Sequence, residues 1–163
     1  MAASNDDLRR VLGDRPASDF LSLVREVIAH VLREEVMSAP VLSTGQALLD
    51  YLRATMAHAA EEQVRALFLD AGNRLLKDEI VTTGSARETV LPPRVVLRRA
   101  LELNASALII AHNHPSGDPR PSSMDRRATR ALAEGARALD IVLHDHIIVA
   151  RSGTTSFRAL GLL

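Results

Sequence analysis

Hydrophobic and polar residues alternate along the chain with two different periods. Over residues 18–36, apolar side chains recur every three or four positions with charged residues between them, which predicts an amphipathic helix. Pro40 interrupts this pattern, and the helical spacing returns over residues 46–56. The sequence Ser43-Thr-Gly-Gln46 before this stretch resembles a helix-capping box. We therefore expect two helices in the first third of the chain.

From Glu62 the period changes to two, as in a strand whose two faces differ. An Asp-Ala-Gly-Asn sequence at 70–73 has turn-forming composition, and residues 75–82 form a second strand-like stretch, which together predict a β-hairpin. Gln63 and Arg65 occupy positions where apolar residues would fit the alternation. We therefore expect the first strand of this hairpin to lie near an edge of its sheet.

Helical and strand-like segments continue to alternate to the end of the chain. Pro93 is placed to begin a third helix, and the uncharged run at 107–111 predicts a strand buried on both faces. A helix starts at Ser122, a strand covers 141–150, and a short strand is expected near Phe157. The apolar stripe expected for the helix consists of Met124, Ala128, Ala131, Leu132, Gly135 and Leu139. The order of elements predicts an α/β sandwich with a mixed β-sheet and flanking helices.

Composition narrows the classes of function. The chain has 163 residues, of which 47% are hydrophobic and 25% charged, as expected for one globular core. Its 20 basic residues balance its 20 acidic ones, and it has one tyrosine, three phenylalanines and no tryptophan. Strong DNA binding is therefore not expected, because neither an overall positive field nor an aromatic stacking surface is available.

We expect neither a membrane-targeting segment nor disulfide bonds in this chain. Its first residues are polar and acidic rather than basic and apolar, and no stretch is apolar enough to span a bilayer. We therefore expect a cytoplasmic protein. Because there is no cysteine, any metal ion must be bound by histidine and carboxylate side chains.

The candidate chemistry lies directly after the apolar strand. His112 and His114 are two residues apart, so an extended backbone presents both imidazoles on one side. A proline-rich loop then returns the chain to Ser122 and Asp125 at the start of a helix. Two imidazoles and one carboxylate suit Zn²⁺, and three protein ligands leave a fourth position for water, as in catalytic zinc sites.

Each part of this pattern also has an ordinary structural explanation. Ser122 and Asp125 have the spacing of a capping box, and histidines at strand ends often bind backbone groups. The two halves together, at this spacing and across a rigid loop, favour a metal site.

The block from Ala111 to Asp125, Ala-His-Asn-His-Pro-Ser-Gly-Asp-Pro-Arg-Pro-Ser-Ser-Met-Asp, resembles the motif of the JAMM (MPN-type) zinc metalloproteases. It is most similar to the RadC-type bacterial members of that family. The resemblance covers the chain from about Pro40 to its end. Further matching segments are Leu67-Phe-Leu-Asp70, Asn73-Arg-Leu75, Arg99-Ala-Leu-Glu-Leu-Asn-Ala105 and Asp145-His-Ile-Ile148.

This resemblance implies a cytidine-deaminase-like α/β fold in which His112, His114 and Asp125 bind zinc. It also implies that Ser122 stabilises the oxyanion of a tetrahedral intermediate. By the same resemblance, the general base is the glutamate that begins the first strand of the hairpin, which is Glu62. A general base needs only hydrogen-bond reach of the attacking water, so the neighbouring Glu61 stays an alternative.

The resemblance further suggests a division of the chain. RadC-type proteins usually carry an N-terminal helix-hairpin-helix segment with a glycine-rich hairpin, whereas residues 1–39 contain only Gly13. We therefore expect residues 1–39 to be a short helical extension in which that module is eroded. Residues 40–163 are expected to form the RadC-type MPN/JAMM domain.

The leading hypothesis for function is a zinc-dependent hydrolase of peptide or isopeptide bonds that uses zinc-activated water and a peptide or protein substrate. The alternative is a non-catalytic zinc-binding interaction module or DNA-repair accessory protein. A nucleobase deaminase is disfavoured because its usual zinc ligands include cysteines. His144 and His146 on the last long strand favour structural roles, with His146 the better candidate for a part in the site. The sequence leaves open whether the chain forms a homodimer.

Overall fold

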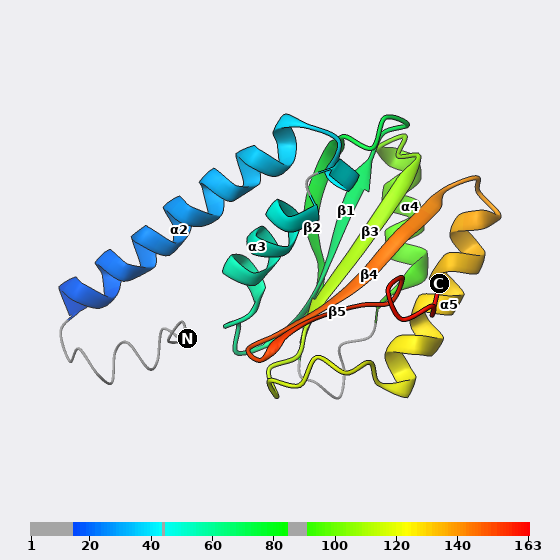
Figure 1. Cartoon of the computed structure of the whole chain (residues 1–163). Coiled ribbons are helices and arrows are strands. Elements are labelled where there is room, and N and C mark those ends of the chain that lie inside the picture. Colours follow the sequence, from blue (N-terminus) through cyan, green and yellow to red (C-terminus); the bar gives the residue numbers. More distant parts are fainter. Residues whose placement is uncertain (1–14, 44, 85–90) are drawn as a thin grey trace.

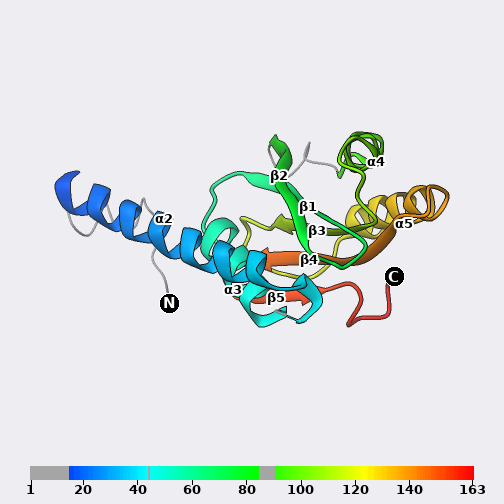
Figure 2. The same ribbon diagram turned by 90° about the horizontal axis from the view of Figure 1, so that it is seen from above.

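The computed structural model describes residues 15–43, 45–84 and 91–163. In these residues a central β-sheet separates two layers of helices (Figures 1 and 2). The helices are α2 (Arg15–Ser38), α3 (Gly45–Met56), α4 (Pro93–Glu102) and α5 (Ser123–Arg137), with a 3₁₀ turn, η1 (Val41–Ser43). The strands are β1 (Glu62–Leu69), β2 (Leu75–Gly84), β3 (Ala107–Asn113), β4 (Val142–Ala150) and β5 (Gly153–Ser156).

The sheet has the strand order β2-β1-β3-β4-β5. All neighbouring strands are antiparallel except β3 and β4, which run parallel and are connected through α5. A parallel pair requires a crossover of this kind, and α5 supplies it. The expected α/β sandwich with a mixed sheet is confirmed, as are the hairpin and the short strand before Phe157.

Two hydrophobic cores cover the two faces of the sheet. One face packs against α3 and the end of α2 through residues such as Leu52, Leu67 and Ile109. The other packs against α4 and α5 and includes Phe68 and Ile110. Every residue of β3 is buried, because helices cover both of its faces.

The expectation that β1 lies near a sheet edge is confirmed, although β1 is not the edge strand itself: it pairs with the edge strand β2 on one side and with β3 on the other. Arg65 is accommodated there by an ion pair with Asp78 of β2, with 2.7 Å between nitrogen and oxygen. The same guanidinium donates to the Tyr51 hydroxyl of α3 at 2.9 Å, and that hydroxyl donates to Asp78. The ion pair with the adjacent strand thus stabilises the Arg65 charge, for which the sequence pattern had suggested contact with solvent.

The buried face of α5 also differs from the expected stripe. Leu132 is buried as predicted, but Met124, Ala131 and Leu139 are exposed. Thr129 is fully buried on this face. A search for apolar residues does not find this position, because threonine is polar. Its hydroxyl forms hydrogen bonds within the protein, which are described below.

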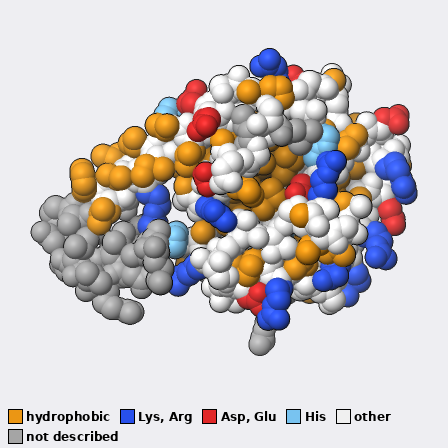
Figure 3. All heavy atoms as spheres, in the orientation of Figure 1, with side chains coloured by type: hydrophobic (Ala, Val, Ile, Leu, Met, Phe, Trp, Pro, Cys, Tyr) orange, Lys and Arg blue, Asp and Glu red, His pale blue; other side chains and the backbone are white. Residues whose placement is uncertain are grey.

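The first helix is present, but much of its apolar stripe is not covered by the described part of the chain. Figure 3 shows hydrophobic side chains gathered along α2. Only its C-terminal portion, including Leu32 and Val36, packs against the core. The large exposed apolar residues of this helix are Phe20, Leu23, Val24, Val27, Ile28, Val31 and Met37. No helix in the described ranges is both long and apolar enough to cross a bilayer.

The expected capping box before α3 is not formed by Ser43 and Gln46, whose side chains bond elsewhere. Ser43 lies in η1 and its hydroxyl donates to the carbonyl of Pro40 at 2.6 Å. The Gln46 amide donates to Asp50 at 2.9 Å. The chain forms a 3₁₀ turn first, and α3 begins only at Gly45.

The two-core arrangement predicts where the sheet is most sensitive to substitution. Phe68→Ala should lower the free energy of unfolding by about 3–5 kcal/mol, because the ring is fully buried between the sheet and the second helix layer. Leu76→Ala on the edge strand β2 should change it by about 0.5 kcal/mol, because that side chain is 43% exposed. Urea unfolding measures both values. Equal losses would contradict this assignment of the core.

Candidate metal centre

Three elements converge at one end of the sheet. The antiparallel pairing of β1 with β3 places Val64 opposite His112, so the start of β1 lies beside the end of β3. The loop that leaves β3 crosses this end of the sheet and enters α5. The first residues of β1, the last of β3 and the first turn of α5 therefore share one region.

Within this region, His112, His114 and Asp125 bring three potential ligand atoms to one point. The Nε2 atoms of the two imidazoles are 2.8 Å apart. The Asp125 carboxylate oxygens lie 3.4 Å from Nε2 of His112 and 3.6 Å from Nε2 of His114. Ligand atoms around a tetrahedral zinc ion are roughly 3.3 Å apart, given Zn–N distances of about 2.0–2.1 Å. The three groups thus fit such an ion with small adjustments.

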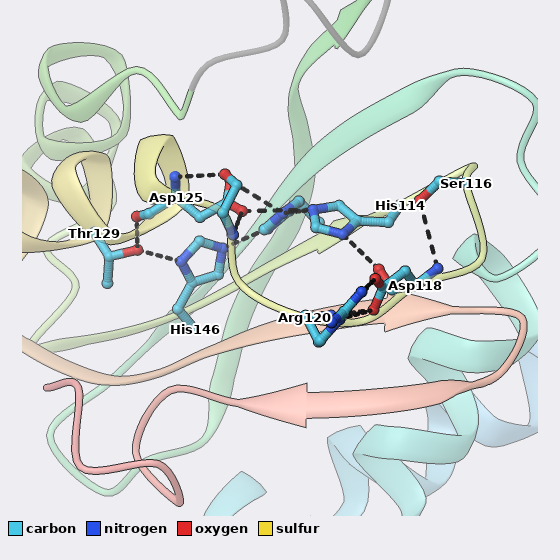
Figure 4. A network of polar contacts seen from close by, with 9 residues as sticks. His114, Ser116, Asp118, Arg120, Asp125, Thr129 and His146 are labelled. Atoms are coloured by element: carbon cyan, nitrogen blue, oxygen red, sulfur yellow. Dashed lines mark hydrogen bonds and ion pairs between the residues drawn. The ribbon is translucent and has the colours of Figure 1, made fainter.

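The other ring nitrogens show which way the imidazole lone pairs point. Nδ1 of His114 donates to the backbone carbonyl of Asp118 at 2.7 Å (Figure 4). Nδ1 of His112 lies 2.7 Å from Nε2 of His146. When His112 donates in that contact, both Nε2 atoms direct unprotonated lone pairs at each other across 2.8 Å. A cation between them removes this repulsion, so the chemistry of the donor set fits a metal ion.

Ser122 and Asp125 form the capping box, and the same arrangement brings Asp125 to the two histidines. The Ser122 hydroxyl accepts from the backbone N–H of Asp125 at 3.1 Å, and the Asp125 carboxylate accepts from the backbone N–H of Ser122 at 2.7 Å. This capping box fixes the start of α5. It therefore also fixes the carboxylate at the point where the two histidines meet.

Glu62 lines the same cleft as the candidate ligands His114 and Asp125. The cleft has a volume of about 350 Å³ and is lined by Glu62, His114, Pro115, Ser116, Ser122, Ser123, Met124 and Asp125. Glu62 is only 7% exposed, whereas the neighbouring Glu61 is exposed. Burial raises the pKa of the Glu62 carboxyl, and the positive field of His114 opposes this only in part. Of the two glutamates, the structure places Glu62 beside the candidate metal ligands.

A residue that the sequence analysis missed holds Glu62 in this position. The buried amide of Asn113 accepts from the backbone N–H of Gln63 at 2.8 Å and donates to the backbone carbonyl of Glu61 at 3.0 Å. These two bonds flank Glu62 and link the start of β1 to the end of β3. The signal in the sequence was the alternation itself, which directs Asn113 away from the two histidines and toward the other face of the sheet.

Electrostatics in the metal-free site separate the two histidines. Burial lowers the pKa of His112 to about 4. The contact with Asp125 raises the pKa of His114, although burial acts in the opposite direction. Burial would raise the pKa of Asp125, but its interactions with His114, His112 and Ser122 outweigh this and hold the pKa well below the usual range. The carboxylate is therefore ionised at neutral pH and available as a ligand.

The two remaining histidines of β4 have different surroundings. His144 is bound through Nε2 to the side chain of Asn73, 2.6 Å away in the β1–β2 turn, which is a structural contact. His146 is buried and touches His112. The expectation that His146 is the better candidate for a part in the site is consistent with this placement.

Comparison with known proteins fits this geometry. The sequence pattern of a family described as the RadC-like JAB domain matches residues 42–162. The chain belongs to this family. It is also 48% identical over 143 residues to a protein named UPF0758 protein from Rhodobacter capsulatus, an alignment that covers 88% of this chain and 67% of the relative. The family match begins after α2, and the expected domain boundary between residues 39 and 40 stays a prediction.

The opposite pKa shifts of the two histidines predict how acid competes with metal. Because its pKa is raised, the His114 ring is protonated once the pH falls below that pKa. A metal ion can then bind only after this proton has left the ring. The low pKa of His112 keeps its proton out of the competition until about pH 4. Zinc affinity, measured with a competing chromophoric chelator, should therefore fall about tenfold per pH unit below the His114 pKa. A hundredfold fall per unit between pH 6 and pH 5 would contradict this assignment.

Proposed function

We propose that this RadC-like JAB domain is a zinc-dependent hydrolase of peptide or isopeptide bonds. The observation that carries the proposal is the position of Glu62, a buried carboxyl that lines the same cleft as His114 and Asp125 of the metal-fitting triad. A structural metal site has no need of a carboxyl group outside the ligand set. A hydrolytic site needs one within reach of the attacking water.

Bound zinc would supply a Lewis acid that polarises the scissile carbonyl and makes water more acidic. Glu62 then accepts the proton of the attacking water and later delivers it to the leaving amine. The raised pKa of Glu62 suits this role, because a carboxyl group that holds a proton more readily is a better acceptor and can return it.

Ser122 supplies the other polar group of the proposed mechanism. One lone pair of its Oγ accepts from the Asp125 backbone N–H, which leaves the hydroxyl hydrogen free for a further bond. Ser122 lines the cleft, which supports a role for that hydrogen in stabilising the oxyanion that develops on the substrate carbonyl.

The proposed substrate is a peptide or protein. The balanced charge of the chain provides no general attraction for the DNA backbone, and its few aromatic residues provide little surface for base stacking. The alternative is a non-catalytic zinc-binding interaction module or DNA-repair accessory protein. Zinc binding without cleavage of any linear or branched peptide would favour this non-catalytic role.

The ligand inventory predicts one zinc ion per chain. Among the described residues, His112, His114 and Asp125 form the group of three that fits an ion, and the sequence has no thiolates for a second structural site. Elemental analysis of protein purified without added metal should give a ratio near one. A ratio near zero after mild purification, or near two, would count against the assignment.

Two substitutions separate the ligand from the base. His114→Ala removes an imidazole ligand and should lose most of the zinc. Glu62→Gln keeps the size of the side chain but cannot accept a proton, so it should keep zinc and lose on the order of 10²–10⁴ in turnover. The measurement is mass-spectrometric detection of cleavage in a library of linear and isopeptide-linked peptides, with zinc content determined on the same samples.

Glu61→Gln is the matched control, because Glu61 is exposed and only its backbone takes part in the Asn113 contacts. It should keep both zinc and turnover. Ser122→Ala should keep zinc, lose part of the turnover and cost about 1 kcal/mol of helix capping. If Glu61→Gln abolishes cleavage while Glu62→Gln does not, the base is misassigned. If neither change matters, the hydrolytic mechanism fails.

A further inference from the structure

A continuous line of buried and partly buried hydrogen bonds runs from the start of α5 to the ring of His112. The Thr129 hydroxyl is 2.6 Å from the backbone carbonyl of Asp125 and 2.5 Å from Nδ1 of His146. Nε2 of His146 is in turn 2.7 Å from Nδ1 of His112. Figure 4 shows Thr129 one turn along α5 from Asp125, with its hydroxyl directed at the His146 ring on β4.

The direction of every proton in this line follows from its first member. A backbone carbonyl only accepts, so the Thr129 hydroxyl must donate to Asp125. Its oxygen then accepts from Nδ1–H of His146, which leaves Nε2 of the neutral His146 ring without a proton. That nitrogen can only accept, so Nδ1 of His112 must carry the hydrogen. Nε2 of His112 is left with a free lone pair directed at His114 and Asp125.

We propose that Thr129 and His146 are positioning residues that set the tautomer of His112 for metal binding. The proposal rests on the proposed role of His112 as a zinc ligand. In the opposite tautomer, Nε2 of His112 would carry a hydrogen and could not bind a metal ion. The two residues therefore determine whether the ligand is available, without touching the metal themselves.

The position of His112 in the sheet explains why its tautomer is set through a relay, by which we mean the hydrogen-bonded pair Thr129 and His146. His114 lies beyond the end of β3 and finds a loop carbonyl, that of Asp118, for its Nδ1–H. His112 lies within β3, between β1 and β4, where the strand carbonyls are engaged in the sheet. Nδ1 of His112 therefore finds its hydrogen-bond partner in a side chain, that of His146. The stacked ring of Phe157, with a centroid distance of 4.7 Å, holds His146 in the required plane.

The test compares Thr129→Val with Thr129→Ser. Valine has nearly the shape of threonine but no hydroxyl, so His146 loses the acceptor for its Nδ1–H and the tautomers downstream are no longer fixed. Serine keeps the hydroxyl. Zinc affinity should fall about 10–100-fold in the valine variant, the usual effect of removing an outer partner of a metal ligand. It should stay close to wild type in the serine variant.

A second readout needs neither zinc nor turnover. Long-range ¹H–¹⁵N spectra of the metal-free protein report which ring nitrogen of each histidine carries the hydrogen. We expect His112 protonated at Nδ1 in the wild type and in Thr129→Ser, and at Nε2 for a substantial part of the molecules in Thr129→Val. His146→Gln keeps an acceptor and a donor at this position and should retain more zinc affinity than His146→Leu.

Several results would overturn the relay. An unchanged His112 tautomer in Thr129→Val would do so, as would unchanged zinc affinity. Equal losses in the valine and serine variants, or in both His146 variants, would show that packing rather than hydrogen bonding is responsible. A chain that binds zinc without cleaving peptides would contradict the proposed hydrolase, while the tautomer spectra would still decide the relay.

Discussion

The site depends on two imidazole rings whose Nε2 atoms the protein holds face to face. Hydrogen bonds at the far side of each ring direct Nε2 of His112 and Nε2 of His114 at each other, 2.8 Å apart, with the Asp125 carboxylate beside them. When neither Nε2 atom carries a hydrogen, the two lone pairs and the carboxylate repel one another, and a cation between them removes this repulsion. The fold tolerates this arrangement because the buried strand β3 fixes one ring and the capped start of α5 fixes the carboxylate.

Much of the fold and the central part of the site could be predicted from the sequence. The period of two located the hairpin because successive side chains of a strand point to opposite faces of the sheet. The period of 3.6 located the helices, of which α3, α4 and α5 bury one face against that sheet. The triad was predictable because its members lie within the short stretch 112–125, where strand geometry and a proline-rich loop restrict where the side chains can go. Glu62 came from the family resemblance, and its burial sets it apart from Glu61.

The remaining features depend on contacts between residues that are distant in sequence. Thr129 was invisible to a hydrophobic pattern because its polar group is satisfied inside the protein by His146 and a carbonyl. Arg65 suggested an exposed position because the sequence does not show that its ion-pair partner, Asp78, lies on the neighbouring strand. The long apolar stripe of α2 correctly predicted an amphipathic helix, but it could not show what the stripe packs against. The described part of the chain covers only the C-terminal part of that stripe.

The central claim is that His112, His114 and Asp125 bind one zinc ion. The most direct measurement is anomalous diffraction at the zinc absorption edge from crystals of protein purified without added metal. We predict a single peak within about 2.0–2.2 Å of Nε2 of both histidines and of an Asp125 carboxylate oxygen. A zinc peak at another position, or a well-ordered triad with no anomalous peak in crystals soaked with zinc, would contradict it.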